Sequence, residues 1–188
     1  MIHTSAGEKV LIDGTGTRNK YDHDWNAQLE DPKPNTVYNV DVTHGDKTVT
    51  YKYETDEYGD TIKVSAELEL SELKSKIRDA TKRNNTTQAD YGGPNPDYDG
   101  GHIIATVFHG PAERVNVIPQ LESQNRRGEW RDMERGWQKG LTPDKGTGEK
   151  DKITVEINIK YDEDRHPKTY TVKSKVNDDP IIKRKFDN

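Results

Sequence analysis

Cysteine is absent from this chain of 188 residues, and its absence excludes several kinds of chemistry. Without thiols the chain has no disulfide scaffold, no cysteine nucleophile and no zinc site built on thiolates. Hydrophobic residues are also scarce: they make up 29% of the chain, whereas charged residues make up 34%, and the mean hydropathy is -1.15. This composition indicates one domain with a modest core and long polar loops.

Long apolar runs are missing as well. A transmembrane helix needs roughly 18 or more consecutive apolar residues, and no window of this chain approaches that length. The segment from Met1 to Gly7 has neither the basic region nor the apolar run of a signal peptide. We therefore expect no membrane partner. If the protein is secreted, we expect its targeting signal elsewhere or on a larger parent chain.

An excess of positive charge is also lacking, because the formal net charge is -5 and the sequence pI is near 5.7. Since neutralising phosphates supplies most non-specific affinity for nucleic acid, this charge argues against a simple electrostatic DNA binder. Basic residues are nevertheless concentrated locally, in a cluster of Arg126, Arg127, Arg131, Arg135 and Lys139. Such a cluster forms either a solvated helix face or a basic cleft on an acidic protein.

The first third of the chain predicts an irregular segment followed by strands. Residues 1–33 have little periodicity and many turn formers, so we expect a lead-in or linker before a domain at 34–188. Alternation of apolar and polar residues then predicts a β-hairpin formed by 37–42 and 49–53. A third strand is predicted at 61–68.

The remaining patterns add helices and a second hairpin around a long polar loop at 84–101. The expected elements are a helix capped by Ser71 and ending near Lys82, a buried strand or helical turn at 102–108, a strand at 115–118, a helix at 127–139 whose tryptophans pack on the sheet, and a β-hairpin at about 152–176. We expect residues 178–188 to fray. The predicted fold class is α+β with an antiparallel β-sheet.

One segment combines residue types suited to phosphodiester hydrolysis, which needs a base for water, a cation for the phosphate oxygens and in-line positioning. His102 follows a glycine pair that would let the substrate backbone approach closely. Its imidazole, with an unperturbed pKa near ~6.5, would be mostly neutral at pH 7. Asn116 and Asn125 offer amide oxygens for a hard cation such as Mg²⁺, and Glu134 lies on the following helix.

Other kinds of site fit the spacing poorly. Residues 95–100 look like the start of an EF-hand loop, but the twelfth position is Thr106 rather than glutamate, and Pro96 lies inside the loop. A zinc site would need a third ligand beside His102 and His109. No serine lies in a glycine-flanked nucleophile elbow, so a serine triad is not indicated.

The run Asp99-Gly100-Gly101-His102, followed by Asn-Val-Ile-Pro-Gln at 116–120 and by 125–134, closely resembles the DNA/RNA non-specific endonuclease family. Its members are His-Me finger (ββα-metal) nucleases. The sequence is similar in particular to the branch used as C-terminal toxin domains of bacterial secreted polymorphic toxins. The resemblance covers roughly 34–141 and implies a ββα-metal finger at about 99–141.

The resemblance also implies a role for each matching residue. His102 would be the general base that activates water, and Asn125 would be the single protein ligand to Mg²⁺, for which Mn²⁺ could substitute. Asn116 would orient His102 or its loop. Glu134 would hold water around the cation.

Several arginines are candidates for binding the phosphate. Arg126, Arg127 or Arg83 would stabilise the developing charge on phosphorus, and the resemblance does not choose between them. Arg131 is a further candidate for substrate binding. The family often has arginine where this chain has Gly100, so another arginine must take over that contact.

The spacing around the metal ligand also departs from the family. One residue usually separates the metal-binding asparagine from the next glycine, whereas here Arg126 and Arg127 both precede Gly128. Counting forward from Pro119 selects Asn125, and counting back from Gly128 selects Arg126. Because arginine cannot ligate a cation, we favour Asn125, with a local bulge at the start of the helix.

The predicted activity is therefore Mg²⁺-dependent, sequence-non-specific cleavage of DNA, with RNA left open as a substrate. The resemblance implies a toxin domain of a larger protein that is secreted and delivered to the cytoplasm of a target cell, with a cognate immunity protein as partner. Two other classes remain open. One is a non-catalytic nucleic-acid-binding or inhibitory domain that retains the finger as a scaffold, and the other is a β-rich protein-interaction module.

Overall fold

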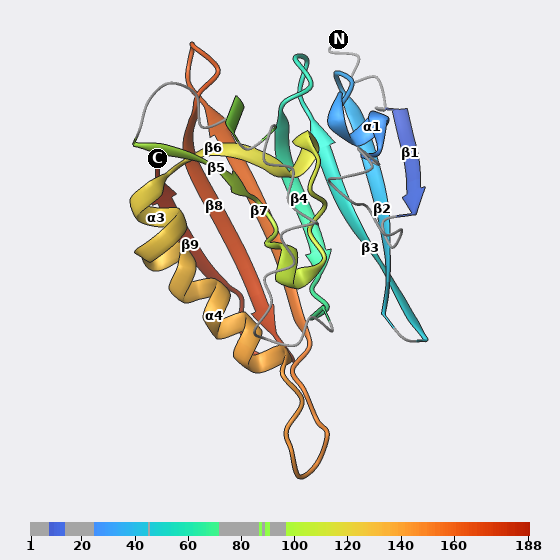
Figure 1. The fold of residues 1–188 in the computed structure, drawn as a ribbon. Coiled ribbons are helices and arrows are strands. Elements are labelled where there is room, and N and C mark those ends of the chain that lie inside the picture. The colour runs from blue at the N-terminus through green and yellow to red at the C-terminus, as the bar shows by residue number, and fades with distance from the viewer. Residues whose placement is uncertain (1–7, 14–24, 45, 72–86, 88, 91–96) are drawn as a thin grey trace.

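A seven-stranded β-sheet forms the body of the protein (Figure 1). The computed structural model describes residues 8–13, 25–44, 46–71, 87, 89–90 and 97–188. The strands are β1 (Glu8–Asp13), β2 (Thr36–His44), β3 (Lys47–Thr55), β4 (Thr61–Glu67), β7 (Ile153–Tyr161), β8 (Pro167–Val176) and β9 (Ile182–Asp187). They lie in the order β1-β2-β3-β4-β7-β8-β9. β1 and β2 pair in parallel, and every other neighbouring pair is antiparallel.

Alternation with a period of two explains why these segments form strands with one buried face. In β7 the isoleucines Ile153, Ile157 and Ile159 are buried together with Val155, while the residues between them are more exposed. The same face of the sheet carries Tyr38, Val40, Val42, Tyr51, Tyr53, Val64, Tyr170 and Val172. Burying one large apolar side chain contributes about 1.5–3 kcal/mol, so the stability of the sheet is spread over many residues.

A short ribbon and two helices lie across the buried face of the sheet (Figure 1). The ribbon pairs β5 (Tyr98–His102) antiparallel with β6 (Val117–Leu121). It continues into α3 (Glu122–Arg127) and α4 (Glu129–Leu141). Between β5 and β6 lie the 3-10 turns η2 (Thr106–Phe108) and η3 (Arg114–Asn116). We call residues 98–141 the finger, and its ββα order positions the candidate site.

The finger is attached to the sheet by an apolar stripe on α4. The buried residues of this helix recur at helical spacing and are Trp130, Met133, Trp137 and Leu141. The ring of Trp130 meets those of Tyr170 and Phe186 edge-on, with centroids 5.7 and 5.2 Å away. Trp137 meets Phe108 in the same way at 6.2 Å. The prediction that the tryptophans pack this helix against the sheet is confirmed for Trp130, whereas the ring contact of Trp137 is with Phe108 of the finger itself.

The predicted fold class is confirmed, because the protein is mixed α+β with a mostly antiparallel sheet. The first predicted hairpin corresponds to β2 and β3, the predicted third strand to β4, and the predicted C-terminal hairpin to β7 and β8. The predicted helix from Ser71 to Lys82 lies outside the described residues apart from Ser71. None of the helices in the described ranges is long and apolar enough to cross a membrane.

The helix predicted at 127–139 is wrong in its bounds, because two helices lie there. α3 ends at Arg127, and Gly128 adopts an extended conformation (φ -93°, ψ -169°) before α4 begins. A Cβ on residue 128 would lie 3.0 Å from the Cα of Gln124, so the break lies where a glycine permits a close approach. In place of the expected bulge at the start of one helix, the chain has a break between α3 and α4 at Gly128, three residues after Asn125.

Three further expectations are corrected. The segment 102–108 is neither a strand nor an α-helical turn throughout: β5 ends at His102, and a 3-10 turn follows at Thr106–Phe108. The strand predicted at 115–118 begins only at Val117. Residues 178–188 do not fray, because β9 pairs with β8 and buries Phe186 against Trp130. Because most residues of β9 are charged and exposed, the sequence does not indicate this contact.

Regular structure also occurs in the segment expected to be irregular. β1 adds a parallel strand beside β2, and α1 (Ala27–Glu30) begins at Asn26, whose side chain accepts hydrogen bonds from the first turn. The backbone N–H of Arg114 donates to the Glu30 carboxylate at 3.1 Å, which ties α1 to η3. The division of the chain at residue 33 stays a prediction.

Candidate active site

His102, the candidate general base, ends β5 where the ribbon meets the loop at 103–116. Its side chain is half-buried, and its backbone lies opposite Val117 in the β5–β6 pairing. The next residue, Ile103, donates its backbone N–H to the carbonyl of Asn116 at 2.9 Å. The backbone of His102 is therefore fixed by the ladder before it and by this bond after it.

Asn116 holds the loop that follows His102. It is fully buried, and its Nδ2 donates to the carbonyls of Ile104 and Pro111, each at 2.8 Å. Its Oδ1 accepts from the N–H of Ile104 at 2.9 Å and from the hydroxyl of Tyr53 at 3.3 Å. A Cβ at Gly110 would lie 1.8 Å from the Ile104 carbonyl oxygen, so this clamp requires glycine there. These contacts fix the loop that follows His102, and the role of Asn116 in orienting His102 or its loop stays a prediction.

Two inward-facing tyrosines of β3 connect this loop to the sheet. Besides the Tyr53 contact, the buried hydroxyl of Tyr51 donates to the carbonyl of Phe108 at 2.8 Å and accepts from the N–H of Glu69 at 3.0 Å. A buried tyrosine hydroxyl needs such a partner, and here the partner is the backbone around the site. The sheet therefore sets the position of the loop through individual side chains.

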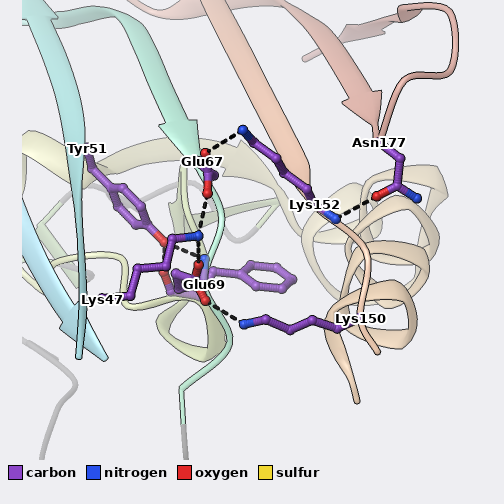
Figure 2. A network of polar contacts seen from close by, with 8 residues as sticks. Lys47, Tyr51, Glu67, Glu69, Lys150, Lys152 and Asn177 are labelled. Atoms are coloured by element: carbon purple, nitrogen blue, oxygen red, sulfur yellow. Dashed lines mark hydrogen bonds and ion pairs between the residues drawn. The ribbon is translucent and has the colours of Figure 1, made fainter. Parts of the chain in front are cut away.

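A network of lysines and glutamates surrounds Glu69, the residue whose backbone N–H donates to Tyr51 (Figure 2). Glu69 is nearly inaccessible, with 3% of its side chain exposed, and accepts from Lys150 at 2.8 Å and from Lys47 at 2.5 Å. Lys47 also contacts Glu67, which Lys152 meets at 3.3 Å. Burial raises the pKa of Glu69, but the lysine hydrogen bonds outweigh it and hold the pKa below its ordinary value. The network fastens the end of β4 to the segment before β7.

Asp99 joins the first motif to the helix that follows the ribbon. Its Oδ2 accepts from Nδ2 of Asn125 at 3.2 Å and from Nε of Arg126 at 2.8 Å, and its Oδ1 accepts from Nη2 of Arg126 at 2.7 Å. The remaining guanidinium nitrogen, Nη1, donates to Glu122 at 2.9 Å. These partners raise the pKa of Arg126 further, chiefly through the hydrogen bonds to Asp99. All three nitrogens of the candidate phosphate-binding Arg126 are thus engaged by carboxylates.

Glu134 lies on α4 in a desolvated position. Burial raises the pKa of its carboxyl to about 7, although the N–H of Trp130, which donates to it at 3.2 Å, and the charge of Arg131 both act to lower it. Near neutral pH this carboxyl therefore exchanges between its charged and neutral forms. Arg131, a candidate substrate-binding residue, acts on this carboxyl through its charge.

The structure explains why residue 101 is glycine, which the sequence did not. A Cβ at residue 101 would lie 2.3 Å from Oε1 of Gln120, whose side chain is fully buried in β6. Neither Oε1 nor Nε2 of Gln120 has a hydrogen-bond partner among the described residues. The close approach that we expected for substrate at this glycine is made by Gln120, which carries an unsatisfied amide beside the motif.

The other two candidate arginines are not placed by the structure. Arg83 lies outside the described residues. The backbone of Arg127 ends α3, and its side chain lies outside the described part of the structure.

The described residues contain no group of three or more His, Cys, Asp or Glu side chains that could hold a metal ion. A centre with one protein oxygen has a candidate in Oδ1 of Asn125. That atom accepts no hydrogen bond from any described residue, since the amide presents its Nδ2 to Asp99. A neutral amide oxygen is a suitable ligand for a hard cation that keeps most of its own waters.

Sheet, ribbon and helices together define a class of protein: an α+β domain with a ββα finger whose first strand ends in histidine. Residues 34–178 match the DNA/RNA non-specific endonuclease family, and the chain belongs to this family. The chain is therefore a nuclease-family domain.

Three relatives with curated descriptions come from strains of one bacterial species. The chain is 33% identical over 109 residues to the type VII secretion system protein EssD of Staphylococcus aureus strains USA300 and NCTC 8325 / PS 47, and to the corresponding protein of strain Newman. The match covers 54% of this chain and 17% of each relative, so the relatives are much longer proteins.

Sequence reasoning missed several residues that shape the site. Asp99 and Gln120 belong to the motif, but the sequence assigns them no role in the site, and it places Tyr51 and Tyr53 in a strand without connecting them to the site. One signal was available for the tyrosines, because they alternate onto the apolar face of β3, where a hydroxyl must find a partner. No comparable signal exists for Asp99, whose partners lie 26 and 27 positions away.

Proposed function

We propose that this domain is a metal-dependent, sequence-non-specific endonuclease that hydrolyses phosphodiester bonds of DNA. Its membership of the endonuclease family gives the reaction class. The observation that carries the proposal is the position of His102 at the end of a ribbon that runs directly into the helices bearing Asn125 and Glu134.

In this proposal each residue has a distinct task. The neutral imidazole of His102 takes the proton of the attacking water, and Asn116 keeps the loop beside it in place. Asn125 would hold Mg²⁺ through Oδ1, with Mn²⁺ as a substitute. The cation supplies electrostatic stabilisation of the phosphate oxygens. The carboxylate of Glu134 orients water on the helix side of the site.

The phosphate contacts come from the basic residues of the finger and its surroundings. Arg131 lies beside Glu134, and Arg127 and Arg83 are further candidates. Arg126 contacts phosphate in this proposal only by exchanging one of its ion pairs with Asp99 or Glu122. Contacts to the backbone of the substrate carry no base information, which is consistent with cleavage independent of sequence.

We further propose that the domain is a toxin. The relatives named above are type VII secretion system proteins, which suggests that the domain is exported as part of a larger chain. A nuclease active on DNA endangers the cell that makes it. The proposal therefore includes delivery to the cytoplasm of a target cell and a cognate immunity protein in the producing cell.

The experiment that tests the proposal is a plasmid-cleavage assay with Mg²⁺ or Mn²⁺, with and without EDTA. We expect wild type to cut supercoiled plasmid and EDTA to stop cleavage. His102→Ala should lower the rate by about 10² to 10⁴, the usual contribution of a general base. An assay on RNA under the same conditions establishes the preference between the two substrates.

His166 offers a matched control, because it is an exposed histidine in the turn between β7 and β8. His166→Ala should cut plasmid like wild type, and both variants should melt like wild type. DNA left intact by wild type under every divalent cation would overturn the enzyme proposal. Retention of plasmid in a gel-shift assay without cleavage would instead favour a non-catalytic binding domain on the same scaffold.

A further inference from the structure

The two ends of the Asn125 side-chain amide face different surroundings. Nδ2 donates to Oδ2 of Asp99 at 3.2 Å, whereas Oδ1 accepts no hydrogen bond from any described residue. A carboxylate carries no donor, so an amide facing Asp99 must present its nitrogen. Asp99 thereby decides which end of the Asn125 amide points away from it, and that end is the oxygen.

Asp99 is itself held in place by Arg126. Nε and Nη2 of the guanidinium donate to the two oxygens of the carboxylate at 2.8 and 2.7 Å, which is the bidentate geometry that fixes a carboxylate in one plane. Nη1 is anchored by Glu122 one turn earlier on α3. The Asp99 side chain is 20% exposed and that of Arg126 is 58% exposed, so the pair lies at the rim of the finger.

We propose that Asp99 and Arg126 form a positioning pair that orients the Asn125 amide with its oxygen toward the cation. The pair joins β5 to α3. Its arginine directly follows Asn125 in the chain, whereas residue 100, where the family often has arginine, is glycine. Arg126 thus acts on the ligand next to it rather than on the substrate. This inference rests on the proposed function only in taking Asn125 as the cation ligand.

Electrostatics and orientation give opposite expectations for Arg126. Removing a positive charge near a cation site should strengthen cation binding if charge alone matters. If Arg126 instead holds the carboxylate that orients Asn125, its removal should weaken binding. The sign of the change therefore separates the two explanations.

The test is a titration of the full chain with Mn²⁺, in which free Mn²⁺ is followed by electron paramagnetic resonance. We expect Arg126→Ala to weaken Mn²⁺ binding about 10-fold, within the 10- to 100-fold range for residues that support a metal ligand. Asp99→Asn should weaken it by a similar factor or more, because an amide at residue 99 can accept from Nδ2 of Asn125 or donate to its Oδ1, and so no longer selects one orientation. The effects should not multiply in the double variant, since both act through one carboxylate.

Arg135 and Asp132 supply matched controls, because they form an exposed ion pair at 3.4 Å on α4. Arg135→Ala and Asp132→Asn should leave the Mn²⁺ dissociation constant within twofold of wild type. Stronger or unchanged binding in Arg126→Ala would overturn the inference, and so would wild-type protein that binds no Mn²⁺. Because the readout is binding, a wild type that binds Mn²⁺ but leaves plasmid intact refutes the proposed function without deciding this inference, which the variants decide.

Discussion

The sheet and the finger are stabilised in different ways. The hairpins β2–β3 and β7–β8 have ladders of eight and nine residue pairs, and the sheet has a common apolar face, so many residues contribute a little each. The two strands of the ribbon pair over five residues only, and the loop between them depends on single side chains such as Asn116 and Tyr51. The loss of one side chain should therefore destabilise the sheet less than the finger, which carries the candidate chemistry.

The largest effect should come from Asn116→Ala. The substitution removes four hydrogen bonds and leaves the N–H and carbonyl groups around Ile104 and Pro111 buried without a partner. We expect unfolding free energy to fall by about 3 kcal/mol or more and plasmid cleavage to be lost. Thermal unfolding followed by circular dichroism, together with the cleavage assay, measures both effects.

The matched change in the sheet is Asn39→Ala, which removes a half-buried asparagine from the outer face of β2. It should alter stability by no more than about 0.5 kcal/mol and leave cleavage intact. Equal losses in the two variants would contradict the contrast between finger and sheet.

A smaller effect is expected for two glutamates, Glu134 and Glu156, whose contributions to the free energy of unfolding should depend on pH with opposite signs. In the finger, burial raises the pKa of Glu134 from 4.5 to about 7, so the folded protein favours the protonated form. Its contribution to stability is present below pH 4.5 and is lost as the pH rises through 7. In the absence of metal, Glu134→Gln should therefore be more stable than wild type at pH 8 by about 1–2 kcal/mol and nearly equal to it at pH 4.5.

Melting curves of both proteins in EDTA between pH 4.5 and 8.5 measure this difference. A melting temperature that responds to pH in the same way in wild type and Glu134→Gln would show that the carboxyl is not desolvated. Added Mg²⁺ should restore part of the stability of the wild type at high pH if the ionised carboxylate assists the site.

A further small effect, with the opposite dependence on pH, is expected for Glu156 on the outer face of the sheet. A hydrogen bond from Asn158 and the lysines Lys173 and Lys63 lower the pKa of Glu156 to about 2. Its contribution is present above pH 4.5 and is lost as the pH falls toward 2. Glu156→Gln should cost less than about 1 kcal/mol at pH 7, because the pair is partly exposed and screened.

Urea unfolding at pH 7 in low and high salt checks this expectation. The difference between wild type and Glu156→Gln should shrink with added salt. A loss as large as that of Asn116→Ala would show that the surface of the sheet is less tolerant than its ladders suggest.

Much of the sheet could be predicted from the sequence, because its strands alternate in a period that the residues display directly. Ile153 to Ile159 show this pattern, and the hairpins on either side of the finger were predicted from it. β9 was missed because its residues are mostly charged, and its pairing depends on β8 and on one buried contact of Phe186. An edge strand of this kind has no local signature.

The members of the candidate site are predicted from the sequence and stay a prediction, whereas the contacts between them had no signal in the sequence. The run ending in His102, with Asn116, Asn125 and Glu134 after it, can be recognised because it resembles the motif of an endonuclease family and offers an imidazole and amide oxygens suited to phosphodiester hydrolysis. The helix bounds around Asn125 were not predictable, because the break at Gly128 depends on how closely the backbone of α3 approaches it.

The sequence alone determined the fold class, the alternating strands and the residues of the motif, since these depend on local periodicity and on side-chain chemistry. The tertiary structure alone decided that Tyr53 holds Asn116, that Glu69 is buried between two lysines, and that the largely exposed Arg126 pairs with Asp99. These contacts join residues from 22 to 81 positions apart. Folding must bring such residues together before their hydrogen bonds exist, so no local pattern in the chain records them.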